Sequence, residues 1–256
     1  GRETLEEYRV GILECLQSIL KHRSLSLEVV HILDDDTSNQ GLLDSVGQLV
    51  AEHGDLLKYS RNRQHLGFVK TANRGIHASR NDVILLNSDT VVTAHWVEKL
   101  RQVAHGQARV ATVTPLSNNA NLFSVPIMDA DNPDDDPELT NRILETVSSQ
   151  ESVPVPTAHG FCMYICRAAL DELGAFDEEA FGVGYGEECD FSLRARDAGY
   201  LNLASSRTYI FHKGRQSFGH SARDRLVKEH MQIIMQRYPY FPAIVRRFRA
   251  QNPLRM

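Results

Sequence analysis

The chain has 256 residues, of which 42% are hydrophobic and 24% are charged, and its formal net charge is −5. This composition is typical of a globular protein of one large or two small domains, and the negative charge argues against a broad nucleic-acid-binding surface. The four cysteines lack paired C-x-x-C spacing, and no apolar run is long enough to span a bilayer. We therefore expect reduced, structural cysteines and a cytoplasmic protein.

The first part of the chain predicts a helix, a short buried strand and a second helix, over residues 4–22, 28–33 and 40–53. The strand ends in three aspartates, Asp34-Asp35-Asp36. Adjacent carboxylates repel one another, so a plain turn rarely needs all three. Asp34 or Asp35 is therefore a candidate to accept hydrogen bonds from a base or ribose, the alternative being a cluster that only caps the next helix.

Residues 62–79 predict a glycine-hinged loop that enters a helix. Asn73 and Arg74 lie in its first turns, where their side chains can reach a phosphate or a base. An Asn-Arg-Gly step is common, so this signal is weak when taken alone.

The stretch from Asp82 to Val92 organises the rest of the chain. Four consecutive apolar residues, 83–86, end in Asn87-Ser88-Asp89, a pattern typical of a buried parallel strand that stops at a site. Ligands of open α/β sheets bind just beyond the carboxyl ends of the strands. A carboxylate at that place, beside an amide and a hydroxyl, can hold a hard divalent cation against a phosphate. The alternative is that Asp89 and Thr90 cap the helix predicted over 95–105.

The middle of the chain predicts a strand over 110–113, an acidic surface loop over 129–137, a short helix over 139–147, and an apolar strand that begins at His159-Gly160. A helix over 167–173 then precedes a loop, 181–186, with three glycines in five residues. Such a loop can lie close to a ligand or move as a lid.

Three acids, Glu187, Glu188 and Asp190, open the helix that follows the glycine loop and ends near Gly199. They are candidates for acid–base chemistry, the alternative being that they only complement the helix dipole. A strand over 209–212 places His212 at its exit, either as a site residue or as a histidine satisfied within the fold. From Ser221 onward the apolar spacing predicts a helix that packs on the preceding domain. The basic end of the chain, 246–249, makes contact with an anionic membrane surface the second interpretation.

The ordered set of these motifs resembles the inverting glycosyltransferases of family 2, which have the GT-A fold. The resemblance covers the chain to about residue 220. It rests on Asp34-Asp35, on Gly67-Phe68 with Asn73-Arg74-Gly75, on Leu86-Asn87-Ser88-Asp89-Thr90, on the glycine loop with Glu187-Glu188-Cys189-Asp190, and on His212. The segments 114–119 and 184–188 further resemble bacterial polysaccharide or rhamnosyl-type transferases.

This resemblance implies an α/β fold of the GT-A type, with a mainly parallel sheet flanked by helices. The transferase domain would occupy residues 1–220, without the strand with which relatives begin, and residues 221–256 would form a helical extension packed on it. The implied activity is metal-assisted transfer of a hexosyl or deoxyhexosyl group from a nucleotide-diphosphate sugar to a glycan or lipid-linked saccharide, with inversion. The implied location is the cytoplasm or the inner face of the membrane, with polysaccharide biosynthesis as the process and no nucleic-acid partner.

The resemblance also assigns roles to individual residues. Glu188 is the general base, with Glu187 and Asp190 as supports, and Asp89 and His212 hold Mn²⁺ or Mg²⁺. Two further sets complete the site: the nucleotide-binding residues Asp34, Asp35, Asn73, Arg74, Asn87 and Ser88, and the acceptor and donor loop residues His159, Gly160, Gly184, Tyr185 and Gly186. Among the departures from the family are Asn-Ser-Asp in place of Asp-x-Asp at 87–89, and Glu188 where the usual base is an aspartate.

Two other functions compete with this interpretation. A sugar-phosphate nucleotidyltransferase would have the same kind of α/β sheet with its site at the strand ends. Such an enzyme needs a Gly-rich phosphate loop bearing Arg or Lys after its first strand, and the sequence has none. A non-catalytic nucleotide- or glycan-binding module of a larger protein is favoured only by the missing first strand.

Overall fold

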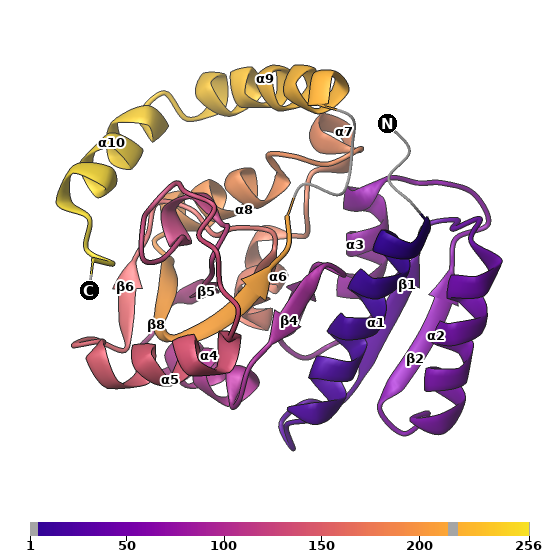
Figure 1. Ribbon diagram of the computed structural model, residues 1–256. Coiled ribbons are helices and arrows are strands. Elements are labelled where there is room, and N and C mark those ends of the chain that lie inside the picture. Colours follow the sequence, from indigo (N-terminus) through magenta and orange to yellow (C-terminus); the bar gives the residue numbers. More distant parts are fainter. Residues whose placement is uncertain (1–4, 215–219, 256) are drawn as a thin grey trace.

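The computed structural model describes residues 5–214 and 220–255, in which strands and helices alternate along most of the chain (Figure 1). The helices are α1 (Leu5–Lys21), α2 (Gln40–Glu52), α3 (Phe68–Ala78), α4 (Trp96–His105), α5 (Pro137–Val147), α6 (Arg167–Leu173), α7 (Glu178–Phe181), α8 (Glu187–Asp197), α9 (His220–Arg237) and α10 (Phe241–Gln251). The strands are β1 (Val30–Asp34), β2 (Leu57–Arg61), β3 (Val83–Leu86), β4 (Thr90–Val92), β5 (Val110–Leu116), β6 (Ser152–Pro154), β7 (Cys162–Ile165) and β8 (Leu201–His212).

A small sheet near the start of the chain contains β1 and β2 in parallel, with α2 as the crossover between them. Figure 1 shows this sheet on the same side of the molecule as α1, α2 and α3. The sequence predicted β1 but not β2. Only Leu57 is buried in β2, so the strand lacks the apolar run that marks a buried strand.

The larger sheet has the strand order β3-β7-β5-β8-β4, and β6 pairs with β8 as well. Only β5 and β8 run parallel within it, whereas the other described pairings are antiparallel. The expected α/β sheet flanked by helices is confirmed, but its predicted mainly parallel direction is wrong. The chain enters β4 and β7 from loops, 87–89 and 155–161, and not from helices that cross the sheet and keep strands parallel.

The organising strand, β3, forms where the sequence predicts it, but its surroundings differ. It runs antiparallel to β7, which is its only partner among the described strands, and its four side chains are half-buried. The prediction of a fully buried parallel strand is therefore wrong for this segment. Apolar content alone does not separate a strand with two neighbours from a strand with one.

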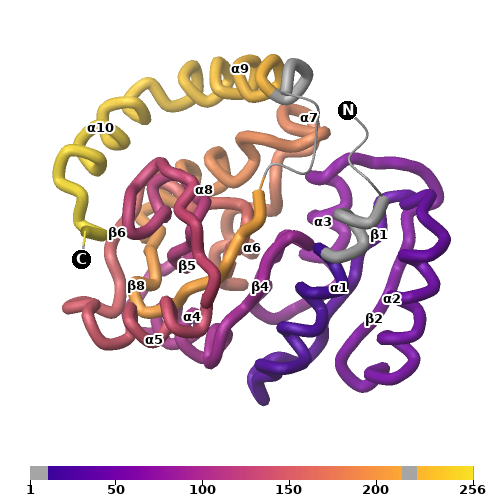
Figure 2. Tube along the Cα trace, viewed as in Figure 1, coloured from indigo at the N-terminus to yellow at the C-terminus, as the bar shows by residue number. Residues whose placement is uncertain are grey.

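Two apolar clusters hold the sheet and helices together. One joins β5, β8, α4 and the end of the chain, and includes Leu100, Tyr209, Phe248 and Leu254. The other joins β7, α6, α8 and α9, and includes Phe181, Phe191 and Ile234. Figure 2 shows α9 running beside α7 and α10 continuing toward β6.

The residues after 220 contribute to this core. Phe241, Phe248 and Leu254 are buried, and the Arg249 guanidinium donates two hydrogen bonds of 2.9 Å to the Asp129 carboxylate. These contacts match the packing interpretation of the tail. A domain boundary at 220 and contact with a membrane remain predictions. Within the described ranges, no helix combines the length and the apolar character needed to cross a bilayer.

Candidate active site

Asp89 and His212 lie side by side at the ends of β3 and β8, as the sequence predicts. His212 pairs with Thr90 across β4 and β8, and the Lys213 N–H donates to the Asp89 carbonyl at 3.0 Å. This pairing brings His212 Nε2 to 3.5 Å from Asp89 Oδ1. Both side chains keep only a small exposed fraction, so their charges interact in a poorly solvated place.

The backbone and ring of His212 are held by two asparagines. The Asn118 side chain accepts a hydrogen bond from the His212 N–H at 2.8 Å and donates to its carbonyl at 3.0 Å. His212 Nδ1 lies 2.7 Å from the Asn119 carbonyl. A carbonyl only accepts, so Nδ1 carries the proton and Nε2 faces Asp89 as either an N–H donor or a lone pair.

Each member of this pair shifts the pKa of the other. Burial on its own would raise the pKa of Asp89, but the hydrogen bond and charge of His212 outweigh it and lower that pKa. Burial on its own would lower the pKa of His212, but Asp89 outweighs it and raises that pKa. Asp89 is therefore a carboxylate at neutral pH.

The donor set of this pair suits a divalent cation. A carboxylate oxygen and an imidazole Nε2, fixed by a hydrogen bond from Nδ1 to a backbone carbonyl, are a common pair of ligands. Across residues 5–214 and 220–255, no third His, Cys, Asp or Glu completes a metal cluster. Asp89 and His212 could therefore supply two ligands to such a cation, with phosphate oxygens and water as the others.

The segment 157–161 connects this pair to the first turn of α8. His159 packs edge-on at 6.5 Å from the His212 ring, and Phe161 stacks on the same ring at 5.2 Å. The neighbouring Ala158 N–H donates to Ser192 Oγ at 2.9 Å, and that hydroxyl donates to the Glu188 carbonyl at 2.6 Å. One short segment therefore touches both the Asp89–His212 pair and the helix that carries the predicted base.

The glycine loop enters α8 through three consecutive left-handed residues. Gly184, Tyr185 and Gly186 have φ of 122°, 68° and 102°. Gly186 is the N-cap of α8, and its N–H donates to Glu188 Oε2 at 3.2 Å. The helix therefore presents Glu187 and Glu188 in its first turn, where the N-terminal dipole favours a negative charge.

Glu187 and Glu188 form an interacting pair of carboxyl groups. Burial, then the negative charge of Glu188, raises the pKa of Glu187 well above its usual value. Burial raises the pKa of Glu188 as well, although the N–H groups at the helix start and a hydrogen bond from Glu187 oppose that rise. Glu187 is thus the member that keeps its proton, and its Oε2 is buried with no hydrogen-bond partner. A neutral Glu187 beside an ionised Glu188 is the state in which only the second residue can act as a base.

Replacing Glu187 by glutamine is expected to raise stability relative to the wild type increasingly as pH rises above about 4.3, the usual glutamate pKa. Because the folded state binds the Glu187 proton more tightly than the unfolded chain does, the contribution of Glu187 to wild-type stability falls as pH rises from the unfolded to the folded pKa of this group. The difference in unfolding free energy should grow by about 1.4 kcal/mol per pH unit within that window. Urea titrations of both proteins from pH 4 to pH 8 would measure it, and a gap that stays constant with pH would contradict the assignment.

Asp190 is fully buried and turned toward α9. Its carboxylate accepts hydrogen bonds from Arg194 at 2.8 Å, Arg237 at 2.9 Å and the Tyr238 hydroxyl at 3.0 Å. These contacts fit the predicted supporting role, since they leave Asp190 no part in proton transfer to a substrate.

The two aspartates at the end of β1, Asp34 and Asp35, have partners within the fold. Asp34 is buried and accepts hydrogen bonds from the Thr37 N–H at 2.8 Å and from the Tyr59 hydroxyl at 2.6 Å. Asp35 accepts hydrogen bonds from the Leu66 and Gly67 N–H groups at 2.7 and 2.8 Å. Both carboxylates therefore fix the loops around β1, and Asp35, which is half-buried, keeps the greater access to a ligand.

The other predicted nucleotide-binding residues divide in the same way. Asn73 is buried, and its amide bonds the Phe176 backbone in both directions and Glu178, so its contacts fit a structural role in place of the predicted ligand contact. The Asn87 backbone bonds Phe161 and Thr90. Arg74 and Ser88 are exposed.

Sequence reasoning missed the residues that position the site: Asn118, Asn119, Ser192 and His230. Asn118 and Asn119 follow the end of β5, so the rule that polar residues after a strand mark a site identifies them. Ser192 and His230 lie inside helices and carry no comparable signal.

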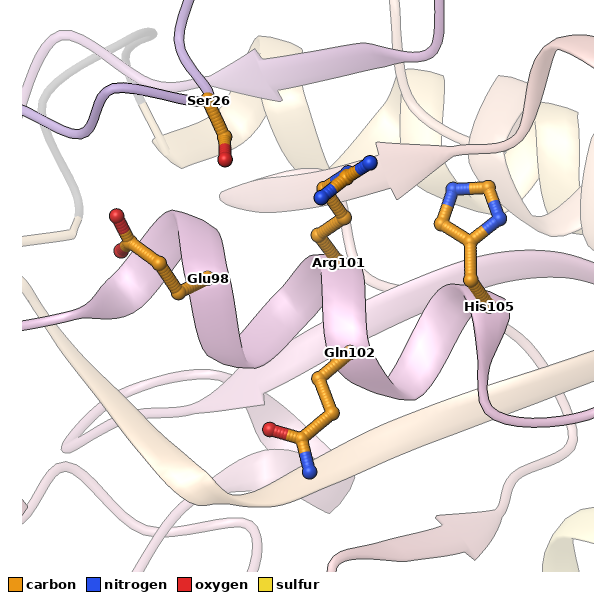
Figure 3. Close-up of a pocket in the computed structure, with 5 residues that line it drawn as sticks. All are labelled: Ser26, Glu98, Arg101, Gln102 and His105. Atoms are coloured by element: carbon orange, nitrogen blue, oxygen red, sulfur yellow. The ribbon is translucent and has the colours of Figure 1, made fainter.

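A pocket of about 230 Å³ lies apart from these residues, along α4 (Figure 3). Its lining is Ser26, Glu98, Arg101, Gln102 and His105, which includes none of the predicted site residues. In Figure 3, Ser26 faces α4 from a separate segment. The mixed charges of the lining indicate no particular ligand.

Comparison with known proteins gives three findings. Residues 5–226 match the family model described as "Glycosyltransferase like family 2". A 64-residue segment, 25% of this chain, is 36% identical to Rv1525 of Mycobacterium tuberculosis and to Mb1552 of Mycobacterium bovis, and it spans 24% of each of these proteins, both described as uncharacterized.

The third finding is a likeness to two solved structures. The first is GalNAc-T7 with UDP, GalNAc and Mn²⁺, with a TM-score of 0.64 and 17% identity, over 96% of this chain and 52% of that one. The second is the mannosyltransferase PcManGT of Pyrobaculum calidifontis with GDP-Man and Mn²⁺, with a TM-score of 0.65 and 15% identity, over 96% of this chain and 66% of that one. This chain thus spans about half to two thirds of these relatives, and the likeness confirms the predicted GT-A fold.

Proposed function

The chain belongs to glycosyltransferase-like family 2, and from this premise we propose that it transfers a sugar from a nucleotide-diphosphate donor to a saccharide acceptor with inversion at the anomeric carbon. The observation that carries the proposal is the connection of two half-sites by the segment 157–161. One half-site is the Asp89–His212 pair, suited to a cation and a diphosphate, and the other is the Glu187–Glu188 pair, suited to proton transfer.

Glu188 is the group that removes the acceptor proton. The acceptor oxygen forms its bond to the anomeric carbon as the bond from that carbon to the diphosphate oxygen breaks, and the acceptor proton moves to the Glu188 carboxylate. The products are the glycoside of inverted configuration and the nucleoside diphosphate. Protonated Glu187 supports this step, because its hydrogen bond, together with the N–H groups at the helix start, opposes the rise in the pKa of Glu188 that burial causes.

Asp89 and His212 would hold a divalent cation, for which Mn²⁺ is the first choice because both solved relatives contain it. When bound, such a cation neutralises charge on the leaving diphosphate. The nucleotide would lie toward β1, α3 and the loop after β3, where Asp35, Arg74 and Ser88 respectively retain access to a ligand. The named ligands of the relatives, UDP and GDP-Man, make uridine and guanosine nucleotides the first to test.

The acceptor would lie along the glycine loop and the segment at His159-Gly160. Two apolar side chains at this rim, Phe68 and Val183, are 40% and 45% exposed, and the Gly67 and Gly184 positions bring their backbones together. Sugars present apolar C–H faces to such surfaces, which supports a glycan or lipid-linked saccharide as acceptor.

The test is a thermal-shift panel of nucleoside diphosphates and nucleotide sugars with and without Mn²⁺, followed by a transfer assay with the best donor. A donor at about 100 times its Kd should stabilise the fold by about 2.7 kcal/mol, and only when Mn²⁺ is present. NMR of the product would then give the anomeric configuration. Retention of configuration would overturn the inverting mechanism, and no shift with any nucleotide would overturn the donor site.

A further inference from the structure

The glycine loop that presents the catalytic acids has a backbone that needs support from outside. Tyr185 has φ of 68°, a left-handed conformation that residues with a side chain disfavour. It lies between two glycines, which have no side chain that could pack against a neighbour and hold the loop in place. Loops of this composition have many other conformations available, so a fixed geometry for Glu187 and Glu188 requires that neighbours hold the loop.

His230 of α9 supplies one such contact at the middle of the loop. His230 is buried, with 8% of its surface exposed, and its Nδ1 lies 2.6 Å from the Tyr185 carbonyl oxygen. Because the carbonyl only accepts, Nδ1 is the donor. The His230 ring also packs edge-on against Phe181 at 5.4 Å, and its Cβ adjoins Gly186.

Arg237, the last residue of α9, and Tyr238, which follows it, hold the two ends of the loop. Arg237 Nη2 lies 2.8 Å from Asp177, which caps α7 before the loop, and Nη1 lies 2.9 Å from Asp190, in the first turns of α8 after it. The Tyr238 hydroxyl donates to the same Asp190 carboxylate. The Arg237 guanidinium also lies 5.5 Å from the centre of the Phe181 ring.

We propose that α9 is a clamp that fixes the glycine loop, 181–186, and that His230 is a positioning residue for Glu188. Three successive points of the path from α7 to α8, namely Asp177, Tyr185 and Asp190, are bonded to one helix. Both His230 and Arg237 lie beyond residue 226, outside the part of the chain that matches the family model. The clamp is thus a contribution of this chain's own C-terminal region, and it rests on the proposed function only in the role given to Glu188.

The clamp acts through geometry. Proton transfer requires Glu188 within hydrogen-bond reach of the acceptor hydroxyl, and a misplacement of about 1 Å can cost about a hundredfold in rate. The Tyr185 carbonyl lies three residues before Glu188, so release of this carbonyl permits the loop to move the base. Donor binding is assigned to Asp89 and His212, which are separate from the residues that His230 contacts, and should be spared.

The experiment compares His230→Leu, which removes the donor, with His230→Asn, whose side-chain N–H can replace Nδ1–H. Gln232→Leu is the matched control, an exposed residue on the same helix. We expect His230→Leu to lower kcat at least tenfold with donor affinity within twofold of the wild type, and His230→Asn and Gln232→Leu to keep kcat within about threefold. Hydrogen–deuterium exchange of residues 181–189 should accelerate in His230→Leu alone.

Three results would overturn the clamp: an unchanged kcat in His230→Leu, an equal loss of kcat in His230→Asn, or unchanged exchange of residues 181–189 in His230→Leu. The exchange measurement also separates the two proposals. If the wild type transfers no sugar, the proposed function fails, while faster loop exchange in His230→Leu with rescue by His230→Asn still supports the clamp.

Discussion

Replacing Glu188 by glutamine is expected to lower kcat by about 10²–10⁴-fold, the usual contribution of a positioned general base. Glutamine keeps the size of the side chain and can still meet the Gly186 backbone, but it has no carboxylate to take the acceptor proton. Affinity for the nucleoside diphosphate, measured by thermal shift with Mn²⁺, should remain within about twofold because Asp89 and His212 are untouched.

The wild-type pH profile provides a second measurement of the same residue. Burial raises the pKa of Glu188, so kcat should fall as pH decreases through a midpoint above the usual glutamate value of about 4.3. The residual activity of Glu188→Gln should lack this acidic limb, because no group titrates at that position. Retention of more than a tenth of kcat, or of the acidic limb, would show that another group is the base.

Glu179→Gln is the matched control for this substitution. Glu179 is an exposed glutamate of α7 in the same stretch of chain, so the change in charge and size is the same. A comparable loss of activity in Glu179→Gln would assign the effect to net charge near the loop, and an unaltered kcat would assign it to Glu188 itself.

Most elements that position the site could be predicted from the sequence, because they are marked by apolar runs that end in polar residues. Val83–Leu86 followed by Asp89, and Tyr209–Phe211 followed by His212, are examples, and the structure brings Asp89 and His212 together. The first half of β8 could not be predicted in this way. Its buried residues include Asn202, whose amide is satisfied by Thr112 and Ser192, so the strand is polar in sequence although it lies in the core.

The direction of the strands and the contacts that support the site could not be predicted from local sequence patterns either, because both depend on residues that are distant in the sequence. The pattern of β3 is the same whether its neighbour runs parallel or antiparallel, and only the return path of the chain decides. Asn73 shows the limit for single residues, since a buried amide that bonds Phe176 and an exposed amide that bonds a ligand have the same sequence signal. His230 bonds Tyr185 across 45 positions, a contact set by how α9 folds back.

Replacing Asp89 by asparagine is expected to abolish the Mn²⁺ dependence of donor binding. It should also lower the affinity for the donor by about a hundredfold or more. Partners that only orient a metal ligand already cost about 10–100-fold in affinity when removed, so loss of a ligand should cost at least as much. An amide oxygen is neutral and is therefore a weaker ligand for the cation. The substitution also removes the interaction with Asp89 that raises the pKa of His212. Thermal-shift titrations of the donor nucleotide with and without Mn²⁺ measure both effects.

The control for this variant is Asp171→Asn, an exposed aspartate of α6 whose replacement changes the net charge equally. Without nucleotide, Asp89→Asn should unfold close to the wild-type temperature, since asparagine fits the same space and the Asn118 and Asn119 contacts to His212 persist. If the Asp89→Asn protein is folded and still binds the donor only with Mn²⁺, the cation is not bound by Asp89 and the assignment is wrong. Loss of the Mn²⁺ response in Asp89→Asn but not in Asp171→Asn would instead assign the cation to the end of β3, because the two proteins differ only in which carboxylate is missing.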